Sequence, residues 1–252
     1  MSLLAIDQGN TRTKFGLFVD GQLRDAWNVP TDKTATASDL HGALDASVRA
    51  APTTMLGLCS VVPELLPAWR QFAQECGYPL TVITGESPTP LINRYATPST
   101  LGPDRLMAAV AAATQVGAPV ISISLGTAIT VDVVSADRRY LGGVIAPGIE
   151  VVSRTLASAA SALHPVDWRI PSAAIGRTTD EALANGLYFQ VIGGLQAMIQ
   201  AMRDSLHVTA PLALTGGWAA QIAPLLDHVA LVDEYLVLHG IAITLAATAS
   251  SP

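Results

Sequence analysis

Asp7, Gly9, Asn10 and Thr11 form a turn whose residue types suit the binding of a polyphosphate. A glycine lets the main chain approach a phosphate oxygen, and the Asn and Thr side chains beside it offer hydrogen-bond donors. The Asp7 carboxylate can hold hydrated Mg²⁺, which prefers carboxylate and water oxygens, and Lys14 adds a positive charge. Ordinary hairpin turns also use Asp, Gly and Asn. This run alone therefore supports phosphate binding and a plain turn equally.

Two further turns have similar chemistry. Residues Gly126 to Asp132 begin with Gly-Thr-Ala at the end of an apolar segment, so a hydroxyl is available to a phosphate. Thr215, Gly216 and Gly217 follow another apolar segment, where a tight strand-to-helix connection is the simpler interpretation. One such turn is weak evidence. Two turns that each open a similar three-stranded unit favour a shared phosphate site.

The segments on either side of the first turn are predicted to form a three-stranded unit. Extended apolar segments are expected at 3–7, 14–19 and 22–29. The turn at 8–11 separates the first two, and Asp20-Gly21, a dipeptide typical of hairpins, separates the next two. The spacing of apolar residues then predicts a helix at 38–50, a strand at 55–62, a helix at 65–76 and a helix from Pro103.

The second half repeats this order. Strands are expected at 120–125, 129–134 and 140–145, followed by helices at 147–160 and 180–206, a strand at 212–214 and a helix at 236–247. Ile6 to Asn10 aligns with Ile123 to Thr127 through the isoleucine and the turn glycine, which indicates an internal duplication. A boundary near 113–118 divides the chain into residues 1–115 and 116–252, in a mixed α/β layout.

Composition excludes several classes of protein. The 252 residues are 50% hydrophobic and 13% charged, which predicts a packed globular protein. A net charge of −6 and the lack of a basic run argue against a nucleic-acid partner. The N-terminus does not resemble a signal peptide, and the longest apolar stretches noted, at 107–113 and 116–123, are too short to span a membrane, so a cytoplasmic protein is expected.

Other catalytic and metal motifs are missing from the sequence. The five histidines show no paired metal spacing, so no metal-ligand cluster is expected. Cys59 and Cys76 are expected to be free thiols rather than a disulfide framework. Neither the Gly-x-Ser-x-Gly elbow of serine hydrolases nor the Gly-x-x-x-x-Gly-Lys loop of P-loop kinases is present.

A series of ordered motifs resembles the type III pantothenate kinase family. The resemblance spans nearly the whole chain, and its motifs are Asp7 to Thr11, Tyr95 to Arg105, Gly126 to Asp132, Gly142 to Gly148, Gly176 to Gly186, Thr215 to Gly217 and Leu236 to Gly240. It implies an α/β fold of two duplicated actin-like ATPase (RNase H-like) domains of the actin/sugar-kinase superfamily. In that architecture the first domain carries the first phosphate loop and the catalytic aspartate, and the second carries the second phosphate loop and an adenosine-side loop, which Thr215 to Gly217 match. It also implies ATP-dependent phosphorylation of pantothenate to 4′-phosphopantothenate, the first step of coenzyme A biosynthesis, by an alcohol-acceptor phosphotransferase.

The resemblance assigns roles to individual residues. Asp104 matches the catalytic aspartate that accepts the proton of the pantothenate hydroxyl. The expected pantothenate contacts are Tyr95, Gly102, Pro103, Asp104, Arg105 and Thr179. The expected ATP contacts are Asp7, Gln8, Gly9, Asn10, Thr11, Arg12, Thr13, Lys14 and Thr127. ATP is expected with Mg²⁺.

Structural roles compete with some of these assignments. Asp104 also fits a helix N-terminal acid, because Gly102-Pro103 reads as a helix start. Arg105 fits either a pairing with the pantothenate carboxylate or a salt bridge between domains. Tyr95 fits ordinary packing. Two functions are alternatives to pantothenate phosphorylation. The chain could be a regulatory or accessory protein with weak catalysis, or a kinase for another small molecule.

The family resemblance also implies a homodimer in which the neighbouring subunit partly closes the substrate site. One position departs from the family pattern. The family carries an aspartate two residues before the second Gly-Thr, where it binds a monovalent cation such as K⁺ or NH₄⁺, and this sequence has Ser124. A neutral hydroxyl is a poorer ligand than a carboxylate. We therefore expect this chain to have lost its K⁺ dependence or its activity, unless Asp132 compensates.

Overall fold

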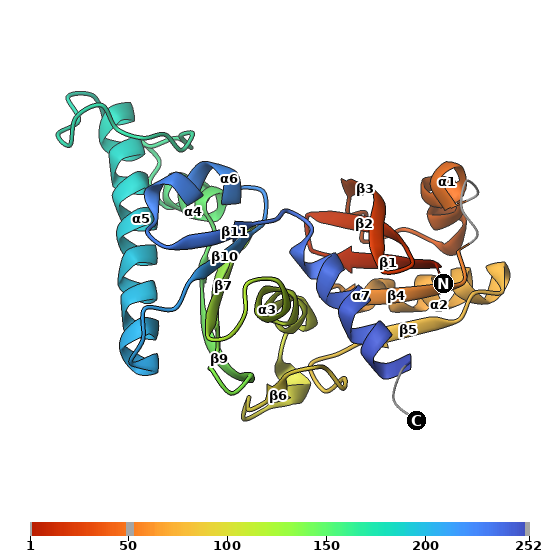
Figure 1. The fold of residues 1–252 in the computed structure, drawn as a ribbon. Helices are drawn as coiled ribbons and strands as arrows, with labels where there is room; N and C mark the ends of the chain where they lie inside the picture. The colour runs from red at the N-terminus through yellow and green to blue at the C-terminus, as the bar shows by residue number, and fades with distance from the viewer. Residues whose placement is uncertain (1, 49–52, 250–252) are drawn as a thin grey trace.

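The computed structural model describes residues 2–48 and 53–249, which fold around two β-sheets (Figure 1). The first sheet has the strand order β3-β2-β1-β4-β5, with β1–β2 and β2–β3 antiparallel and β4 and β5 parallel to β1. Its strands are β1 (Ser2–Gln8), β2 (Arg12–Val19), β3 (Gln22–Pro30), β4 (Met55–Ser60) and β5 (Leu80–Ile83).

The second sheet repeats this arrangement. Its order is β11-β10-β7-β8-β9-β6, so the run β9-β8-β7-β10-β11 has the topology of the whole first sheet. Its strands are β7 (Val120–Leu125), β8 (Ala128–Val134), β9 (Arg139–Pro147), β10 (Leu212–Thr215), β11 (Val229–Val232) and β6 (Ile92–Asn93). The predicted duplication is therefore confirmed by strand order and direction.

The turn between β2 and β3 shows how the sequence sets the register. Asp20 and Gly21 both have positive φ, 50° and 77°, as a two-residue type I′ hairpin requires. The turn pairs Val19 with Gln22, and the register carries on toward Lys14 opposite Asn28 after one shift near Leu17. The first phosphate turn is thereby held at the opposite end of the same hairpin.

Helices cover both outer faces of the sheets. The outer face of the first sheet packs against α1 (Ala37–Val48) and α2 (Leu66–Cys76), and that of the second against α4 (Ile149–Ala159), α5 (Thr179–Leu206) and α6 (Ala219–Ile222). Short 3₁₀ turns lie at Pro63–Leu65, Pro98–Thr100 and Ala223–Leu225. Each outer layer has its own apolar core, which is what the amphipathic spacing of these segments predicts.

Two helices, α3 (Pro103–Gln115) and α7 (Leu236–Ala249), lie between the sheets (Figure 1). They pack so closely that a Cβ on Gly240 would lie 2.0 Å from the carbonyl oxygen of Met107. Along α3, the small side chains of Ala108, Ala109 and Ala111 to Ala113 are all buried. Small side chains on both helices allow this approach, and the two sheets share one core across it.

Most predicted elements are present with ends that differ by a few residues. The predicted helix at 38–50 corresponds to α1, and its end at Ala50 lies outside the described residues. Three short strands, β5, β6 and β11, were not predicted, because two to four residues are too few to show a period. The boundary near residue 115 stays a prediction: β6 precedes it yet joins the second sheet, and α7 follows it yet packs on β1 and β4.

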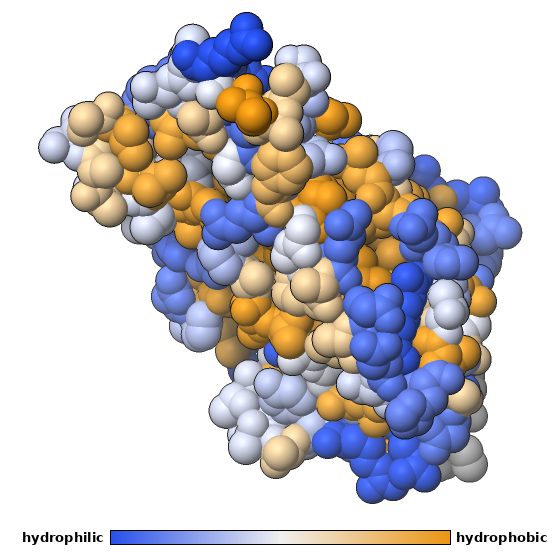
Figure 2. Space-filling view, turned by 90° about the vertical axis from the view of Figure 1, so that its left-hand side faces the viewer, coloured by the Kyte–Doolittle hydropathy of each residue, from blue (hydrophilic) through white to orange (hydrophobic). Residues whose placement is uncertain are grey.

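Among the described helices, α5 is long and apolar enough to cross a membrane by length and composition. Core helices of soluble proteins pass the same test. Here α5 packs its buried side chains, among them Leu187, Val191 and Leu195, on the second sheet. Figure 2 looks onto this side of the molecule and shows apolar areas interspersed with hydrophilic ones.

Candidate active site between the two sheets

Asp7 lies near the end of β1, in the middle of the first sheet. Its register partners are Lys14 on β2 and Cys59 on β4. The pKa of Asp7 is raised from 3.8 to about 7, first by burial and then by the charge of Asp104, while Lys14 acts in the opposite direction. The sequence-predicted carboxylate is thus placed against a second carboxylate from a helix that begins almost 100 positions later.

The turn after Asp7 has a fixed backbone. Gly9 N donates to Arg12 O at 3.0 Å, and a Cβ at Gly9 would lie 3.1 Å from that oxygen. The Thr31 hydroxyl donates to Gly9 O at 2.8 Å and lies 3.0 Å from the Thr13 hydroxyl. The Asn10 side chain accepts from Lys33 Nζ at 2.8 Å.

The remaining members of this turn have structural partners. Gln8 is buried and accepts from the Ser60 hydroxyl at 2.8 Å. Arg12 donates to the side chain of Asn28 on β3. The turn therefore presents Asn10 and Thr11 outward while Gln8 and Thr13 anchor it.

The structure brings the first two glycine turns together. Thr11 Oγ1 lies 2.9 Å from Thr127 Oγ1, although 116 positions separate the residues. The second turn is held by Gly126 N, which donates to Ala128 O at 3.0 Å, and by Gly148 N, which donates to Thr127 O at 3.0 Å. A phosphate that entered between the turns would meet both hydroxyls.

The third turn adjoins the second. Gly216 has φ +94°, and a Cβ there would lie 2.5 Å from Leu125 O, so only glycine fits this backbone. Thr215 Oγ1 donates to Glu234 O at 3.3 Å, and Lys14 Nζ donates to the same oxygen at 2.7 Å. The segment before α7 thereby connects the third turn to the strand that follows the first.

Asp104 lies in the first turn of α3, with Gly102 as the capping residue and Pro103 as the first helical residue. A Cβ on Gly102 would lie 2.6 Å from Asp104 Oδ1, so glycine leaves room for this carboxylate. Oδ1 accepts from Arg105 N at 2.9 Å, which makes Asp104 a helix N-terminal acid as well. Burial raises the pKa of Asp104 and outweighs that hydrogen bond.

Cys59 is a member of this cluster that the sequence did not single out. It is fully buried, and burial together with the charges of Asp7 and Asp104 raises the pKa of its thiol. The signal was its place at the end of β4, because parallel strands that end together bring their last residues to one edge. The thiol stays protonated and packs as a small apolar group.

Arg105 forms a salt bridge between α3 and the second sheet. Its Nε lies 3.2 Å from both carboxylate oxygens of Asp132, and its Nη2 lies 2.6 Å from Oδ1. The Tyr140 hydroxyl also donates to Asp132 at 2.7 Å, and the guanidinium lies 5.7 Å from the centre of the Tyr95 ring. Two roles were predicted for Arg105, a contact to the pantothenate carboxylate or a salt bridge between domains, and the structure contains a salt bridge. Asp132 and Tyr140 complete the cluster.

Tyr95 belongs to this cluster through packing. Its ring lies 6.2 Å from that of Tyr140 and lies against Gly142, where a Cβ would come within 3.1 Å. Gly142 also has φ +101°, so any other residue there would be strained and would displace the ring. The ring and the guanidinium of Arg105 are thereby fixed together.

Asp132 does not lie opposite Ser124. It pairs in register with Ser122, whereas Ser124 pairs with Thr130 and Thr215. Its carboxylate is bound by Arg105 and Tyr140. The expectation that Asp132 compensates for the missing carboxylate at position 124 therefore lacks the required geometry.

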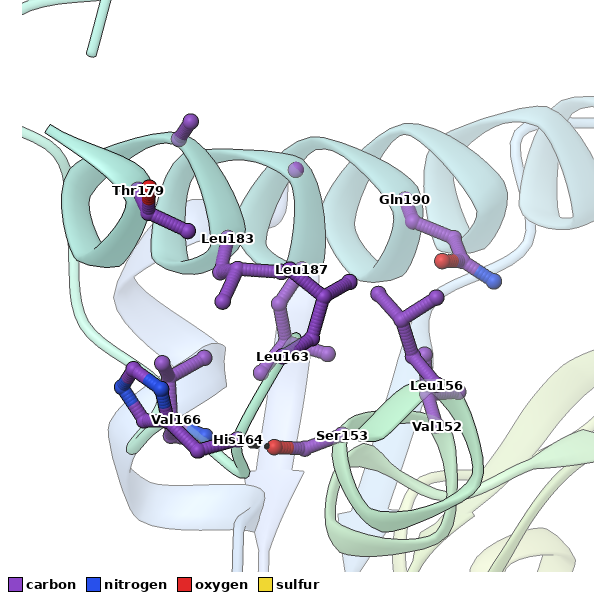
Figure 3. A pocket seen from close by; sticks show the side chains of 12 residues that line it. Val152, Ser153, Leu156, Leu163, His164, Val166, Thr179, Leu183, Leu187 and Gln190 are labelled. Carbon is purple, nitrogen blue, oxygen red and sulfur yellow. Dashed lines mark hydrogen bonds between the residues drawn. The ribbon is translucent and has the colours of Figure 1, made fainter. Parts of the chain in front are cut away.

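Thr179 lies apart from the other predicted substrate residues. It is the first residue of α5, capped by Thr178, whose side chain accepts from Glu181 N at 3.1 Å. It lines a pocket of about 410 Å³ between α4 and α5, together with Leu183, Leu187 and His164 (Figure 3). Within a single chain, this pocket is not shared with Tyr95 or Asp104. The start of α5 lies at the outer end of the molecule, away from α3 (Figure 1).

The sequence model of a known family, described as type III pantothenate kinase, matches residues 3–201. This chain belongs to the type III pantothenate kinase family. The match takes in Asp7, Asp104, Thr127 and Thr179. Membership accounts for the paired glycine turns and the duplicated sheets in one chain.

Individual relatives match this chain along nearly its full length. Proteins named type III pantothenate kinase are 35% identical in Parafrankia sp. and 34% in Thermomicrobium roseum, each over 95% of both chains. One from Finegoldia magna is 31% identical, over 96% of this chain and 95% of its own.

Solved structures support the fold. A Baf-family protein from Campylobacter jejuni, described as a transcriptional activator, has a TM-score of 0.65 at 19% identity, with 98% of this chain and 100% of that chain covered. A ROK-family glucokinase from Streptomyces griseus, in complex with glucose and AMPPNP, has a TM-score of 0.59 at 13% identity, with 96% and 98% covered. The type III pantothenate kinase fold of this chain is thus of the actin-like ATPase type.

Proposed function

We propose that this chain transfers the γ-phosphate of ATP to the hydroxyl of pantothenate, giving 4′-phosphopantothenate and ADP, the first step of coenzyme A biosynthesis. The observation that carries the proposal is the contact between Thr11 and Thr127, which joins the two glycine turns at one place. Close by, the charge of the Asp104 carboxylate helps to raise the pKa of Asp7. Family membership supplies the substrate.

Asp104 is the residue we assign to proton transfer. The hydroxyl oxygen of pantothenate attacks the γ-phosphorus while its proton passes to the Asp104 carboxylate, and the bond to the bridging oxygen of ADP breaks. A raised pKa makes Asp104 a stronger base than an exposed aspartate. The hydrogen bond that Asp104 Oδ1 accepts from the backbone N–H of Arg105 holds the carboxylate in place.

The residues assigned to ATP are the first turn, Asp7 to Lys14, and Thr127. Asp7 is the group that would hold Mg²⁺, since two neighbouring carboxylates of like negative charge favour a cation beside them. Among residues 2–48 and 53–249, no group of three or more His, Cys, Asp or Glu side chains could hold a metal alone. Mg²⁺ usually keeps waters and phosphate oxygens as ligands. When bound, it neutralises charge on the transferred phosphate.

Tyr95, Gly102, Pro103 and Arg105 are assigned to the pantothenate site beside Asp104. The Arg105 nitrogens Nε and Nη2 face Asp132. A pantothenate carboxylate would therefore meet the outer edge of the guanidinium. Residues 1–115 and 116–252 are the two actin-like halves whose turns clamp ATP.

We assign the α4–α5 side of the molecule to a homodimer. Large apolar side chains on this side are exposed, with 47% of Leu156, 50% of Phe189 and 82% of Ile175 accessible. A second copy would cover them and bring its Thr179 to the substrate site of the first. This accounts for the distance between Thr179 and the other pantothenate residues within one chain.

Catalysis without K⁺ is part of the proposal. Ser124 offers one hydroxyl, and the nearest carboxylate on the same strand pair, Asp132, is bound by Arg105 and Tyr140. These groups do not fit a monovalent cation site. We place the enzyme in the cytoplasm, with pantothenate and ATP as partners and without a nucleic acid or a membrane. No feature of the described residues favours the regulatory alternative.

The test is ATP-dependent phosphorylation of radiolabelled pantothenate, with and without K⁺. We expect turnover under both conditions and a loss of about 100-fold or more in kcat for Asp104→Asn, because the proton acceptor is removed. Asp227→Asn, an exposed aspartate of the second half, is the matched control and retains wild-type turnover. Turnover in Asp104→Asn would refute the role of Asp104. No turnover with any cation would refute the kinase and favour an accessory role.

A further inference from the structure

Cys76, His41 and Glu75 form a polar cluster where α1 packs on α2, on the outer side of the first sheet. Cys76 Sγ lies 3.8 Å from His41 Nδ1, within reach of a weak hydrogen bond, and His41 Nε2 lies 3.0 Å from Glu75 Oε2. A nucleophile, a base and a group that orients the base therefore lie side by side. The cluster is separate from the site assigned to ATP and pantothenate, and no motif discussed above includes His41 or Glu75.

Two neighbours fix the base. The Phe72 ring packs edge to face on His41, with centroids 4.8 Å apart at 61°. Gln71 Nε2 donates to Glu75 Oε1 at 2.8 Å, and the hydrogen bonds from Gln71 and His41 lower the pKa of Glu75. An ionised carboxylate only accepts hydrogen bonds, so His41 Nε2 carries a proton. In the neutral ring Nδ1 is then an acceptor, and it faces the thiol of Cys76.

The place of Cys76 in α2 makes this base necessary. Cys76 is the last residue of α2, and Gly77 after it has φ +71°, the left-handed conformation typical of a helix C-terminus. The negative end of the helix dipole disfavours a thiolate there. A cationic His41 ring offsets this effect, because it places a positive charge beside the sulfur.

The two cysteines of the chain differ in access as well as in partners. Cys76 is partly buried, and the side chains of His41 and Glu75 beside it are 40% and 45% exposed. Cys59 is fully buried, and burial with two nearby carboxylates raises the pKa of its thiol. A reagent in solution therefore reaches Cys76 but not Cys59. Because Cys76 is only partly exposed, that reagent must be small.

We propose that Cys76 is a modification site at which a small-molecule disulfide forms a mixed disulfide with this chain. The proton of Cys76 passes to His41 Nδ1, and the thiolate sulfur attacks one sulfur of the reagent. The S–S bond of the reagent breaks as the new S–S bond forms. The leaving thiolate takes the proton from His41 and departs as a thiol. The exchange consumes no further oxidant, and the inference does not depend on phosphoryl transfer.

Mass spectrometry of the full chain during incubation with glutathione disulfide tests the site. We expect one adduct per chain, on the peptide that contains Cys76, removable with dithiothreitol and absent in Cys76→Ser. At about pH 7, His41→Gln should slow the reaction about 3-fold or more, because the imidazole raises the thiolate fraction by more than it lowers the nucleophilicity of the sulfur. His164→Gln changes an exposed histidine of the second half and is the matched control, with an expected wild-type rate.

A second measurement separates proton transfer from packing. At about pH 10 the thiol ionises without a base, so the wild type should lose its advantage over His41→Gln. An equal advantage at both pH values, with circular dichroism that shows folded variants, would overturn the proposal, since His41 would then only shape access to the sulfur. The absence of an adduct, an adduct on Cys59 in place of Cys76, or equal rates in His41→Gln and wild type at neutral pH would overturn it too. These outcomes are the same whether or not the wild type phosphorylates pantothenate.

Discussion

Arg105 and Asp132 form a buried ion pair that fastens the start of α3 to β8, with Nη2 2.6 Å from Oδ1. Asp104 directly precedes this anchor, so the pair fixes the position of the proposed proton acceptor. Asp132→Ala would leave a guanidinium buried without its partner. We expect it to lower the free energy of unfolding by about 3–5 kcal/mol in urea denaturation.

A double-mutant cycle separates the pair from general packing. Arg105→Met with Asp132→Leu removes both charges and should cost less than the sum of the two single changes. Glu150→Ala breaks an exposed pair with Arg154 and serves as the control, with an expected cost below about 1 kcal/mol. Additive losses in the cycle would show that the two side chains do not depend on each other.

Asp7 should make the unliganded protein less stable as pH rises. Its pKa is raised from 3.8 to about 7, so between these values the folded state holds a proton that the unfolded state releases. The contribution is therefore favourable at low pH and is lost as pH rises through 7. Asp7→Asn removes this dependence and should exceed the wild type in unfolding free energy at pH 8 by up to about 4 kcal/mol.

Thermal unfolding of both proteins from pH 4 to pH 8 measures this effect. The difference between Asp7→Asn and wild type should be small at pH 4 and grow toward pH 8. Asp32→Asn is a suitable control, because hydrogen bonds from Thr34 lower the pKa of that exposed carboxyl. A constant difference across the range would contradict the raised pKa.

Ser124→Asp should create a dependence on K⁺. The new carboxylate would stand beside Thr130 and Thr215, which pair with residue 124. We expect the wild-type rate to be the same in KCl and in choline chloride, and the variant rate to rise with KCl. Ser124→Asn, similar in size and neutral, is the control. A steep K⁺ requirement in the wild type would disprove its independence of the cation.

Gly240→Ala should separate α7 from α3. The added Cβ would lie 2.0 Å from Met107 O, so the helices must move apart, and we expect a loss of about 2 kcal/mol or more. Gly193→Ala in α5 is the matched control, since its Cβ would meet nothing within 4 Å. It should be neutral or stabilise by up to about 1 kcal/mol. Equal effects in chemical denaturation would refute the close contact.

The sequence by itself determined the repeated units and the positions of the glycine turns. Asp20-Gly21 sets a hairpin because few residues adopt positive φ, and Gly102-Pro103 starts a helix because proline fits its first turn. These are local effects, decided within a few residues. Family membership followed from the order of such motifs along the chain.

The tertiary structure alone decided which distant groups meet. From the sequence, Arg105 could be either a substrate contact or a member of a salt bridge. Only the packing of α3 on β8 placed Asp132 beside it. Likewise, the meeting of Thr11 with Thr127 depends on how two whole sheets pack around α3 and α7. Local sequence fixes an element's type and its polar face, but long-range contacts fix its partners, because burial energy is summed over the complete core.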